Sequence, residues 1–223
     1  MSAAALAHPR MRVWPASPRD KLQLALWTAA EIAEATGGVA SGDFQCSGVE
    51  MDSRDVRVGD LFVALKGEAM DGHRFVDKAI AAGAAAALVD RPVDWPHVLV
   101  EDTTAALHAL AAAARERSPA KRIAVTGSVG KTGVKEAIFT ALDRSSRGQA
   151  HRSIRSYNNH VGVPLSLARM NARARYGVFE MGMNHAGEIA PLVDHVRPDV
   201  AVITTIAPAH IENLGSIEAI ADE

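Results

Sequence analysis

The segment Arg122-Ile123-Ala124-Val125-Thr126-Gly127-Ser128-Val129-Gly130-Lys131-Thr132 decides how the second half of the chain folds. Its first four residues predict a short buried strand, and the residues from Lys131 to about Leu142 predict a helix. The loop between them is rich in small residues, so its backbone N–H groups can approach an anion, which the helix N-terminus also attracts. Strand, loop and helix in this order predict a phosphate-binding loop.

The loop residues have distinct expected roles. Lys131 can neutralise the β and γ phosphates of a nucleotide, and the Thr132 hydroxyl can bind Mg²⁺. The pattern G-x-x-x-x-G-K-[ST] would put its first glycine at Val125, so the loop is a variant. A glycine turn with an exposed lysine is the alternative. The residues expected to contact the nucleotide are Thr126, Gly127, Ser128, Val129, Gly130, Lys131 and Thr132.

Two further strands are predicted after the loop, over Tyr176–Glu180 and Val200–Thr205, each preceded by a helical stretch. Parallel strands with helical crossovers are the simplest arrangement. Ligands of such sheets bind beyond the carboxyl ends of the strands. We therefore expect the Glu180 carboxylate and the His210 imidazole near the loop, Glu180 as a ligand of the magnesium ion.

A pair of amides, Asn158-Asn159, lies between the loop helix and the Glu180 strand, just before a helical stretch that begins near Pro164. Such residues can cap a helix. Their amide groups can also donate to phosphate oxygens and accept from water. Asn159 is thus a candidate either for helix capping or for supporting the metal and substrate.

The residues before the loop predict a smaller α/β domain. Thr28-Ala29-Ala30-Glu31 has the form of a capping box, and short strands alternate with helices as far as Arg115. The charged run from Arg115 to Lys121, which contains Pro119, marks the expected boundary. The predicted organisation is a flexible tail over residues 1–20, a domain over 21–117 and an incomplete second domain over 120–223.

Asp52-Ser53-Arg54 follows a short apolar strand in the first domain. Turn chemistry explains an aspartate there. A hydroxyl and a guanidinium suit an anionic diphosphate or carboxylate, so Ser53 and Arg54 are candidate substrate ligands.

Composition excludes several classes of function. The chain has 223 residues, with 24 Lys and Arg against 26 Asp and Glu, so it has no basic field suited to nucleic acid. No apolar run approaches the roughly 20 residues that span a bilayer, and no secretory signal is evident. We therefore expect a cytoplasmic protein with no membrane or nucleic-acid partner. The sequence does not indicate an oligomeric state.

Four segments together resemble the Mur ligases. They are Thr126 to Thr132, Asn158 to Leu165, Glu180-Met181-Gly182-Met183-Asn184 with Gly187-Glu188-Ile189, and Ala209-His210 with Gly215-Ser216. The pieces Asp52-Ser53-Arg54, Gly59 to Leu65 and Asp71-Gly72-His73-Arg74-Phe75 look like the UDP-binding domain of that family. The resemblance extends from about Leu26 to Glu223.

The resemblance implies an ATP- and Mg²⁺-dependent amide ligase of peptidoglycan synthesis. It would join D-alanyl-D-alanine to UDP-N-acetylmuramoyl-tripeptide through an acyl phosphate. Carried over by position, Lys131 would hold the phosphates, Thr132 and Glu180 one magnesium ion and His210 a second, with Asn159 in support. Ser53 and Arg54 would lie near the UDP moiety. The implied fold is a small UDP-binding α/β domain followed by part of a parallel-sheet, P-loop-type ATPase domain.

Two departures from the family pattern stand out. Gly133 stands where the family usually carries Thr or Ser. Family members also continue with a lysine on the helix that starts near Ser216, then the rest of the central domain and a further C-terminal domain. We therefore expect an N-terminal portion that is inactive alone. Another P-loop amide ligase, such as a folylpolyglutamate-type enzyme, and a non-catalytic module that binds a nucleotide or UDP-sugar remain as alternatives.

Overall fold

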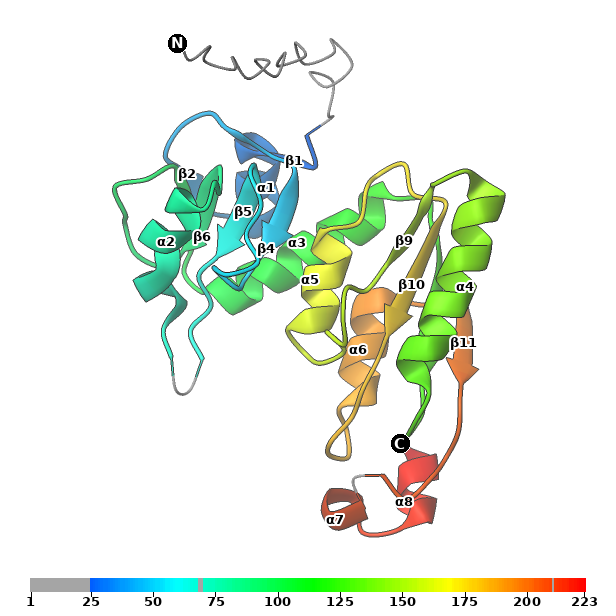
Figure 1. Ribbon diagram of the computed structural model, residues 1–223. Helices are drawn as coiled ribbons and strands as arrows, with labels where there is room; N and C mark the ends of the chain where they lie inside the picture. Colours follow the sequence, from blue (N-terminus) through cyan, green and yellow to red (C-terminus); the bar gives the residue numbers. More distant parts are fainter. Residues whose placement is uncertain (1–24, 68–69, 210) are drawn as a thin grey trace, which may run out of the picture.

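The computed structural model describes residues 25–67, 70–209 and 211–223 and contains two main parallel or mostly parallel sheets. Figure 1 shows one sheet built from the residues before α3 and the other from the residues after it, with α3 and α5 between them. The tail expected over residues 1–20 lies outside the described residues. The boundary between the two predicted domains, at residues 118–119, stays a prediction.

The first sheet has five strands, and three of its four neighbouring pairs are parallel. β2 pairs antiparallel with β7, while β7, β6, β5 and β4 pair in parallel in that order. A separate two-stranded antiparallel ladder joins β1 to β3. The strand bounds are β1 Trp27–Thr28, β2 Val39–Ala40, β3 Gln45–Cys46, β4 Gly48–Glu50, β5 Asp60–Val63, β6 Ala86–Val89 and β7 His97–Leu99.

Helices cover both faces of this sheet. α1 (Ala29–Thr36) and α3 (Thr103–Arg117) contribute to the apolar core on one face, and α2 (Val76–Ala81), after the 3₁₀ turn Gly72–Phe75, packs on the other. The alternation of side chains along β5 explains this, because Leu61 and Val63 face the first core while Phe62 faces the second. The strand–helix alternation predicted here is confirmed, although α3 continues through the charged run to Arg117.

The predicted capping box at the start of α1 is confirmed. The Thr28 side chain accepts a hydrogen bond from the Glu31 amide, and the Glu31 carboxylate accepts one from the Thr28 amide at 2.7 Å. α1 ends where the backbone turns left-handed at Gly37, a conformation that glycine adopts readily at helix ends.

The second sheet has four strands, all parallel, in the order β11-β8-β10-β9. The parallel arrangement predicted for it is confirmed, and β10 has the predicted bounds. β9 was not anticipated. The strands are β8 Lys121–Thr126, β9 Ala150–Arg152, β10 Tyr176–Glu180 and β11 Val200–Ile203.

α4 (Lys131–Ser146) covers one face of this sheet, and α5 (Gly162–Ala168) and α6 (Ile189–Val196) cover the other. Ile123 and Val125 of β8 pack toward α4, whereas Ala124 between them packs toward α5 and α6. Two short helices, α7 (Ile211–Leu214) and α8 (Ile217–Asp222), end the described chain, and Ser216 caps α8.

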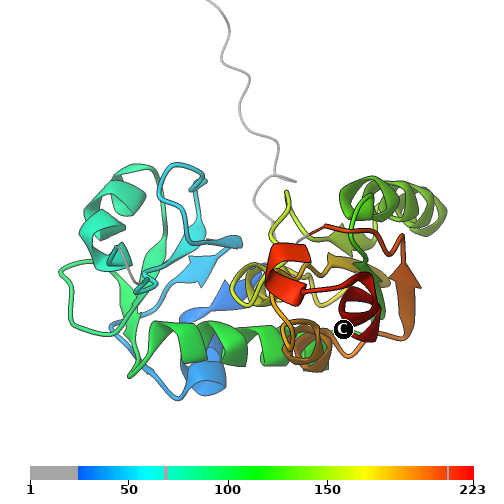
Figure 2. The ribbon, with the colours of Figure 1, turned by 90° about the horizontal axis from the view of Figure 1, so that it is seen from below.

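The cores of the two sheets meet at α3 and α5, which contribute residues to both. α5 packs along α3, and its residues Leu165 and Ala168 belong to the core of the first sheet. The buried Trp27 ring donates from Nε1 to the Ala168 carbonyl at 2.8 Å. Figure 2, turned by 90°, shows α3 running beneath the first sheet and ending beside α6. Packing across this junction therefore fixes the two sheets relative to one another.

A buried ion pair spans the same junction. Arg169, after α5, donates from Nη1 to Glu50 Oε2 at 3.0 Å, and the two side chains are 13 % and 6 % exposed. The other carboxylate oxygen of Glu50 accepts from the amides of Met51 and Asp52. Because both oxygens are occupied, the burial of this charge is compensated.

Among the described residues, none of the helices has both the length and the apolarity that a bilayer-spanning segment needs.

Acid should destabilise the fold through His151. This half-buried residue of β9 contacts Phe179 and donates from Nε2 to the Ser166 carbonyl at 2.7 Å. Burial lowers the His151 pKa to about 4, against the Ser166 hydrogen bond, which raises it. The unfolded chain therefore binds this proton more readily, so the contribution to stability is full above pH 6.5 and is lost as the pH falls toward 4.

Between pH 7 and pH 4.5 we expect this histidine to cost about 2 kcal/mol of unfolding free energy. The measurement is urea unfolding of the wild type and of His151→Gln, which keeps a donor for Ser166 but does not titrate. Parallel stability curves for the two proteins over this range would show that His151 is not the responsible group.

Candidate functional site

The predicted phosphate loop lies at the carboxyl edge of the second sheet. β8 and β10 pair so that Val125 is opposite Glu180, and both strands end at this edge. The first turn of α4 starts there too, and the Thr132 hydroxyl donates to Glu180 Oε2 at 2.9 Å. The structure thus brings together Thr132 and Glu180, the two described residues that were expected to share a metal.

Two glycines set the course of the loop. Gly127 has φ 125° and Gly130 has φ 87°, values that favour glycine. A Cβ atom on Gly127 would lie 2.3 Å from Thr204 Oγ1 and 3.0 Å from the Thr205 backbone. α4 then begins with no side-chain cap, which leaves its first N–H groups directed at the loop. The Lys131 ammonium folds over the loop and donates to the Gly127 carbonyl at 2.7 Å.

The loop is also fastened to the chain that follows β11. The Ser128 amide donates to the Thr205 carbonyl at 2.8 Å, and the Ser128 hydroxyl donates to the Ala207 carbonyl at 2.9 Å. Thr204 Oγ1 donates to the Val129 carbonyl at 2.6 Å. These bonds make the loop a fixed part of the sheet edge. The remaining expected loop residue, Thr126, is the last residue of β8.

Glu180 is almost fully buried and is contacted on both carboxylate oxygens. Asn158 donates from Nδ2 to Oε1 at 3.0 Å, while the ammonium of the buried Lys135 lies 3.5 Å from Oε2. The Glu180 amide donates to Ser153 Oγ at 3.1 Å. Gly182 permits the close approach of Asn158, because a Cβ there would lie 2.7 Å from Asn158 Cγ. The carboxylate is therefore held in one position by fixed partners.

The structure places Asn159 differently from Asn158. Asn159 Oδ1 accepts from the amides of Val161 at 3.3 Å and Gly162 at 2.9 Å, which is the capping role considered for it. The residue still lines the cavity next to the loop. His210 lies outside the described residues, so its expected place as catalytic residue and metal ligand stays a prediction.

A cavity of about 350 Å³ opens beside Lys131. On its far side Glu188 organises the turn after β10, because its carboxylate accepts from the amides of Asn184 at 2.6 Å and His185 at 3.3 Å. These hydrogen bonds lower the Glu188 pKa, that from Asn184 most. The cavity is lined by Lys131, Asn158, Asn159, His160, Gly182, Met183, Asn184, Gly187, Glu188, Pro191 and Leu192.

A second, larger cavity of about 680 Å³ lies where the carboxyl end of β4 meets the segment after β9. Both candidate substrate ligands line it, but Ser53 is buried while the Arg54 side chain is 77 % exposed. Arg54 is paired with Asp52, whose pKa it lowers to about 2. The lining residues are Met51, Asp52, Ser53, Arg54, Leu65, Met70, Phe75, Lys78, Arg155 and Tyr157.

The sequence patterns did not indicate a site role for Lys135, Asn158, Arg155 or Tyr157. A signal existed for Lys135, which stands three residues after Thr132 and so shares its helix face. For Asn158 the sequence indicated only a pair of adjacent asparagines and not which of the two contacts the carboxylate. Arg155 and Tyr157 lie in a loop without a regular period, and only the packing of the two sheets brings them to the first domain's cavity.

We expect Gly127→Ala to open the loop and Gly133→Ala to leave it intact. The added methyl group at position 127 collides with the chain after β11 and requires a φ that alanine avoids. Gly133 is within α4, and a Cβ there meets nothing within 4 Å. Gly127→Ala should thus lower the free energy of unfolding by at least about 1 kcal/mol, while Gly133→Ala should raise it by about 0.5–1 kcal/mol.

Denaturant unfolding of the two variants side by side measures both effects. Equal stabilities for the two alanine variants would contradict the geometry of the loop.

These features define a phosphate-loop α/β protein. The glycine-rich loop lies between a buried parallel strand and an uncapped helix, and the carboxylate of the neighbouring strand accepts from the hydroxyl at the helix start. Residues 45–126 match the model of the Mur ligase family, catalytic domain, and residues 125–223 match that of the Mur ligase middle domain. These two adjoining ranges take in most of the chain, which therefore belongs to the Mur ligase family.

Curated relatives from two different bacteria carry one and the same protein name. The UDP-N-acetylmuramoyl-tripeptide–D-alanyl-D-alanine ligase of Escherichia coli K12 is 42% identical over 197 residues, which cover 87% of this chain and 43% of the relative. The Bacillus subtilis 168 protein of that name is 43% identical over 180 residues, with 78% and 39% covered. The chain thus spans less than half the length of these relatives.

Solved structures agree with the fold. A crystal structure of MurF from Acinetobacter baumannii aligns with a TM-score of 0.75 at 37% identity, over 88% of this chain and 44% of that one. The MurF ligase from Thermotoga maritima, solved in complex with ADP, aligns with a TM-score of 0.63 at 34% identity, over 78% and 41%. The predicted fold class, a small α/β domain followed by part of a P-loop-type domain, is confirmed.

Proposed function

We propose that the chain is the substrate- and nucleotide-binding portion of an ATP-dependent ligase that joins D-alanyl-D-alanine to UDP-N-acetylmuramoyl-tripeptide. The observation that carries the proposal is the Thr132–Glu180 contact of 2.9 Å beside a phosphate loop, on a chain that also has a separate polar cavity around Ser53. The printed names of the relatives supply the two substrates.

The loop is suited to the β and γ phosphates of ATP. Backbone amides at the uncapped start of α4 favour an anion, and the Lys131 ammonium already lies over the loop at 2.7 Å from the Gly127 carbonyl. A nucleotide phosphate would replace that carbonyl as the partner of the ammonium. The ADP in the Thermotoga maritima relative supports this assignment.

Thr132 and Glu180 fit a magnesium ion. Both offer oxygen atoms, which Mg²⁺ prefers, and the carboxylate is already oriented by Asn158 at 3.0 Å. When bound there, Mg²⁺ would neutralise charge on the phosphate oxygens. The ammonium of Lys135, 3.5 Å from Glu180, balances the charge of the carboxylate when no metal ion is bound. A second ion at His210 remains part of the proposal.

The chemistry assigned to the ligase requires positioning more than a protein nucleophile. The tripeptide carboxylate attacks the γ-phosphorus, the bond to the β-phosphate oxygen breaks, and ADP leaves. The neutral amine of D-alanyl-D-alanine then attacks the acyl carbon, its nitrogen releases a proton to solvent, and inorganic phosphate leaves. Lys131 would neutralise the transferred phosphate, while Ser53 and Arg54 would hold the UDP end of the substrate. We assign the cytoplasm as the site of action, where ATP is available, with no membrane or nucleic-acid partner.

We expect Lys131→Ala to weaken MgADP binding by at least about 10-fold, because the phosphates lose their cationic partner in the loop. Binding of UDP-N-acetylmuramoyl-tripeptide should change less than twofold, since its cavity is lined by other residues. Isothermal titration calorimetry of the 223-residue chain measures both, with Arg144→Ala, on the exposed far part of α4, as the control. Undiminished MgADP binding by Lys131→Ala would overturn the role of the loop.

The 223-residue chain should not convert substrates by itself. It spans less than half the length of the relatives, and a ligase needs sites for both ATP and the incoming dipeptide. A phosphate-release assay with UDP-N-acetylmuramoyl-tripeptide, D-alanyl-D-alanine and MgATP should stay at the background rate. Sustained release that requires all three compounds would show that these residues suffice for activity.

A further inference from the structure

Arg155, in the segment between β9 and α5, touches both candidate sites. Its side chain lines the cavity around Ser53. Its main-chain carbonyl accepts a hydrogen bond of 2.8 Å from Lys135 Nζ, and that ammonium lies 3.5 Å from Glu180 Oε2. One residue therefore connects the cavity of the first sheet to the carboxylate of the phosphate site.

The guanidinium of Arg155 contacts an aspartate and lies over the Tyr157 ring, with Cζ 5.9 Å from the ring centroid. Nη2 contacts Asp55 Oδ1 at 2.7 Å, and the two side chains are 57 % and 27 % exposed. Asp55 raises the Arg155 pKa, first through this hydrogen bond. An ion pair so open to water is weak and is screened by salt, so an anionic ligand can displace the aspartate at small cost.

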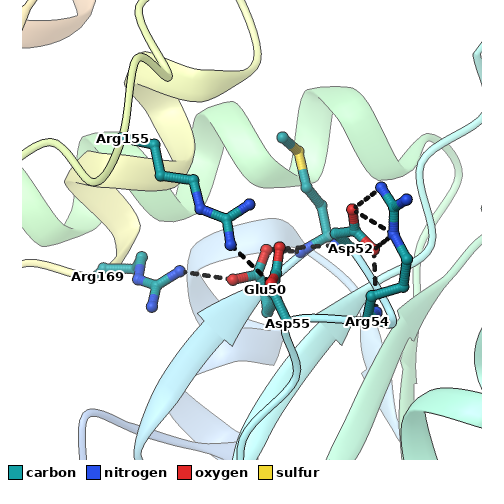
Figure 3. A network of polar contacts seen from close by, with 7 residues as sticks. Glu50, Asp52, Arg54, Asp55, Arg155 and Arg169 are labelled. Carbon is teal, nitrogen blue, oxygen red and sulfur yellow. Dashed lines mark hydrogen bonds and ion pairs between the residues drawn. The ribbon is translucent and has the colours of Figure 1, made fainter.

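The other two arginines in Figure 3 are less free to change partners. Arg54 is tied to Asp52 by its Nε and Nη2 atoms and by its backbone amide. Arg169 is buried with Glu50. Arg54 and Arg155 both line the cavity, but of the three arginines only Arg155 comes from the segment after β9 and contacts its aspartate through a single hydrogen bond.

The backbone at Arg155 fixes the directions of its two contacts. The residue has φ 54°, a left-handed conformation that is uncommon outside glycine. In this conformation the carbonyl is directed at Lys135 while the side chain extends toward the first domain. The contact with Lys135 and the contact with the cavity therefore start from the same residue, one from its peptide group and one from its side chain.

We propose that Arg155 binds an anionic group of the ligand in the cavity around Ser53, exchanging Asp55 for a phosphate or carboxylate, and that this exchange positions Lys135 and Glu180. The inference rests on the proposed function for the identity of the ligand. Arg155 acts on the reaction through other residues, so it is a positioning residue. Filling the cavity should consequently alter nucleotide affinity.

Variants at the two ends of the same ion pair should differ in their affinity for the substrate. Arg155→Gln and Arg155→Gly should weaken binding of UDP-N-acetylmuramoyl-tripeptide by about 10-fold or more at low salt, because a charge-assisted contact is lost. Glycine suits the left-handed backbone, so strain cannot explain a loss in that variant. Asp55→Asn should bind as tightly as the wild type or tighter, because the competing carboxylate is removed.

Calorimetry of the 223-residue chain with two probes identifies the anionic group. UDP carries the diphosphate alone, and UDP-N-acetylmuramoyl-tripeptide adds the peptide carboxylates. A loss of affinity for both probes assigns the diphosphate to Arg155, and a loss for the longer probe alone assigns a carboxylate. Arg173→Gln, which removes another exposed arginine, controls for net charge.

The second readout is the coupling between the two sites. In the wild type, saturation with UDP-N-acetylmuramoyl-tripeptide should change the dissociation constant of MgADP by about fivefold or more, and Arg155→Gln should bring that ratio close to one. A purely structural ion pair would not produce this difference.

The outcomes separate the inference from the proposed function. Equal weakening by Asp55→Asn and Arg155→Gln, or full affinity and coupling in the Arg155 variants, overturns the role of Arg155 while leaving the ligase assignment standing. A folded wild-type chain that binds neither the UDP compounds nor MgADP contradicts the proposed function itself.

Discussion

The parallel pairing of β8 with β10 is the constraint on which the candidate phosphate site depends. With Val125 opposite Glu180, the two strands end at the same level, and the α4 helix starts one loop later. A one-residue shift in this register would turn the Glu180 side chain to the other face of the sheet, away from Thr132. Phe179 and Val178, packed on opposite faces, oppose such a shift.

The burial of Glu180 imposes a second constraint. A carboxylate removed from water costs several kcal/mol unless other groups replace its hydration. Here Thr132, Asn158 and Lys135 replace it, and each comes with a backbone requirement of its own. Asn158 needs a glycine at position 182, and Lys135 needs the Arg155 carbonyl. The charged centre therefore determines the path of the chain for some distance around it.

Elements with strong local signals could be predicted from the sequence. The capping box of α1 and the strand Tyr176–Glu180 are encoded by adjacent residues, and the structure has them where expected. β9 is an edge strand of three residues without a β-branched side chain, so its pairing depends on tertiary contacts. For the same reason composition could not decide which of two adjacent asparagines turns toward Glu180.

The segment 153–162 shows why the two sites could not be predicted as a connected pair. Ser153 and Asn158 contact Glu180, while Tyr157 between them lines the cavity of the first sheet. Gly162 then starts α5 against the Tyr157 backbone, where a Cβ would lie 2.7 Å from the Tyr157 carbonyl carbon. Because α5 is buried in both cores, the C-terminal end of this segment is anchored. Its side chains are thereby divided between two candidate sites, a division that no local pattern in the sequence specifies.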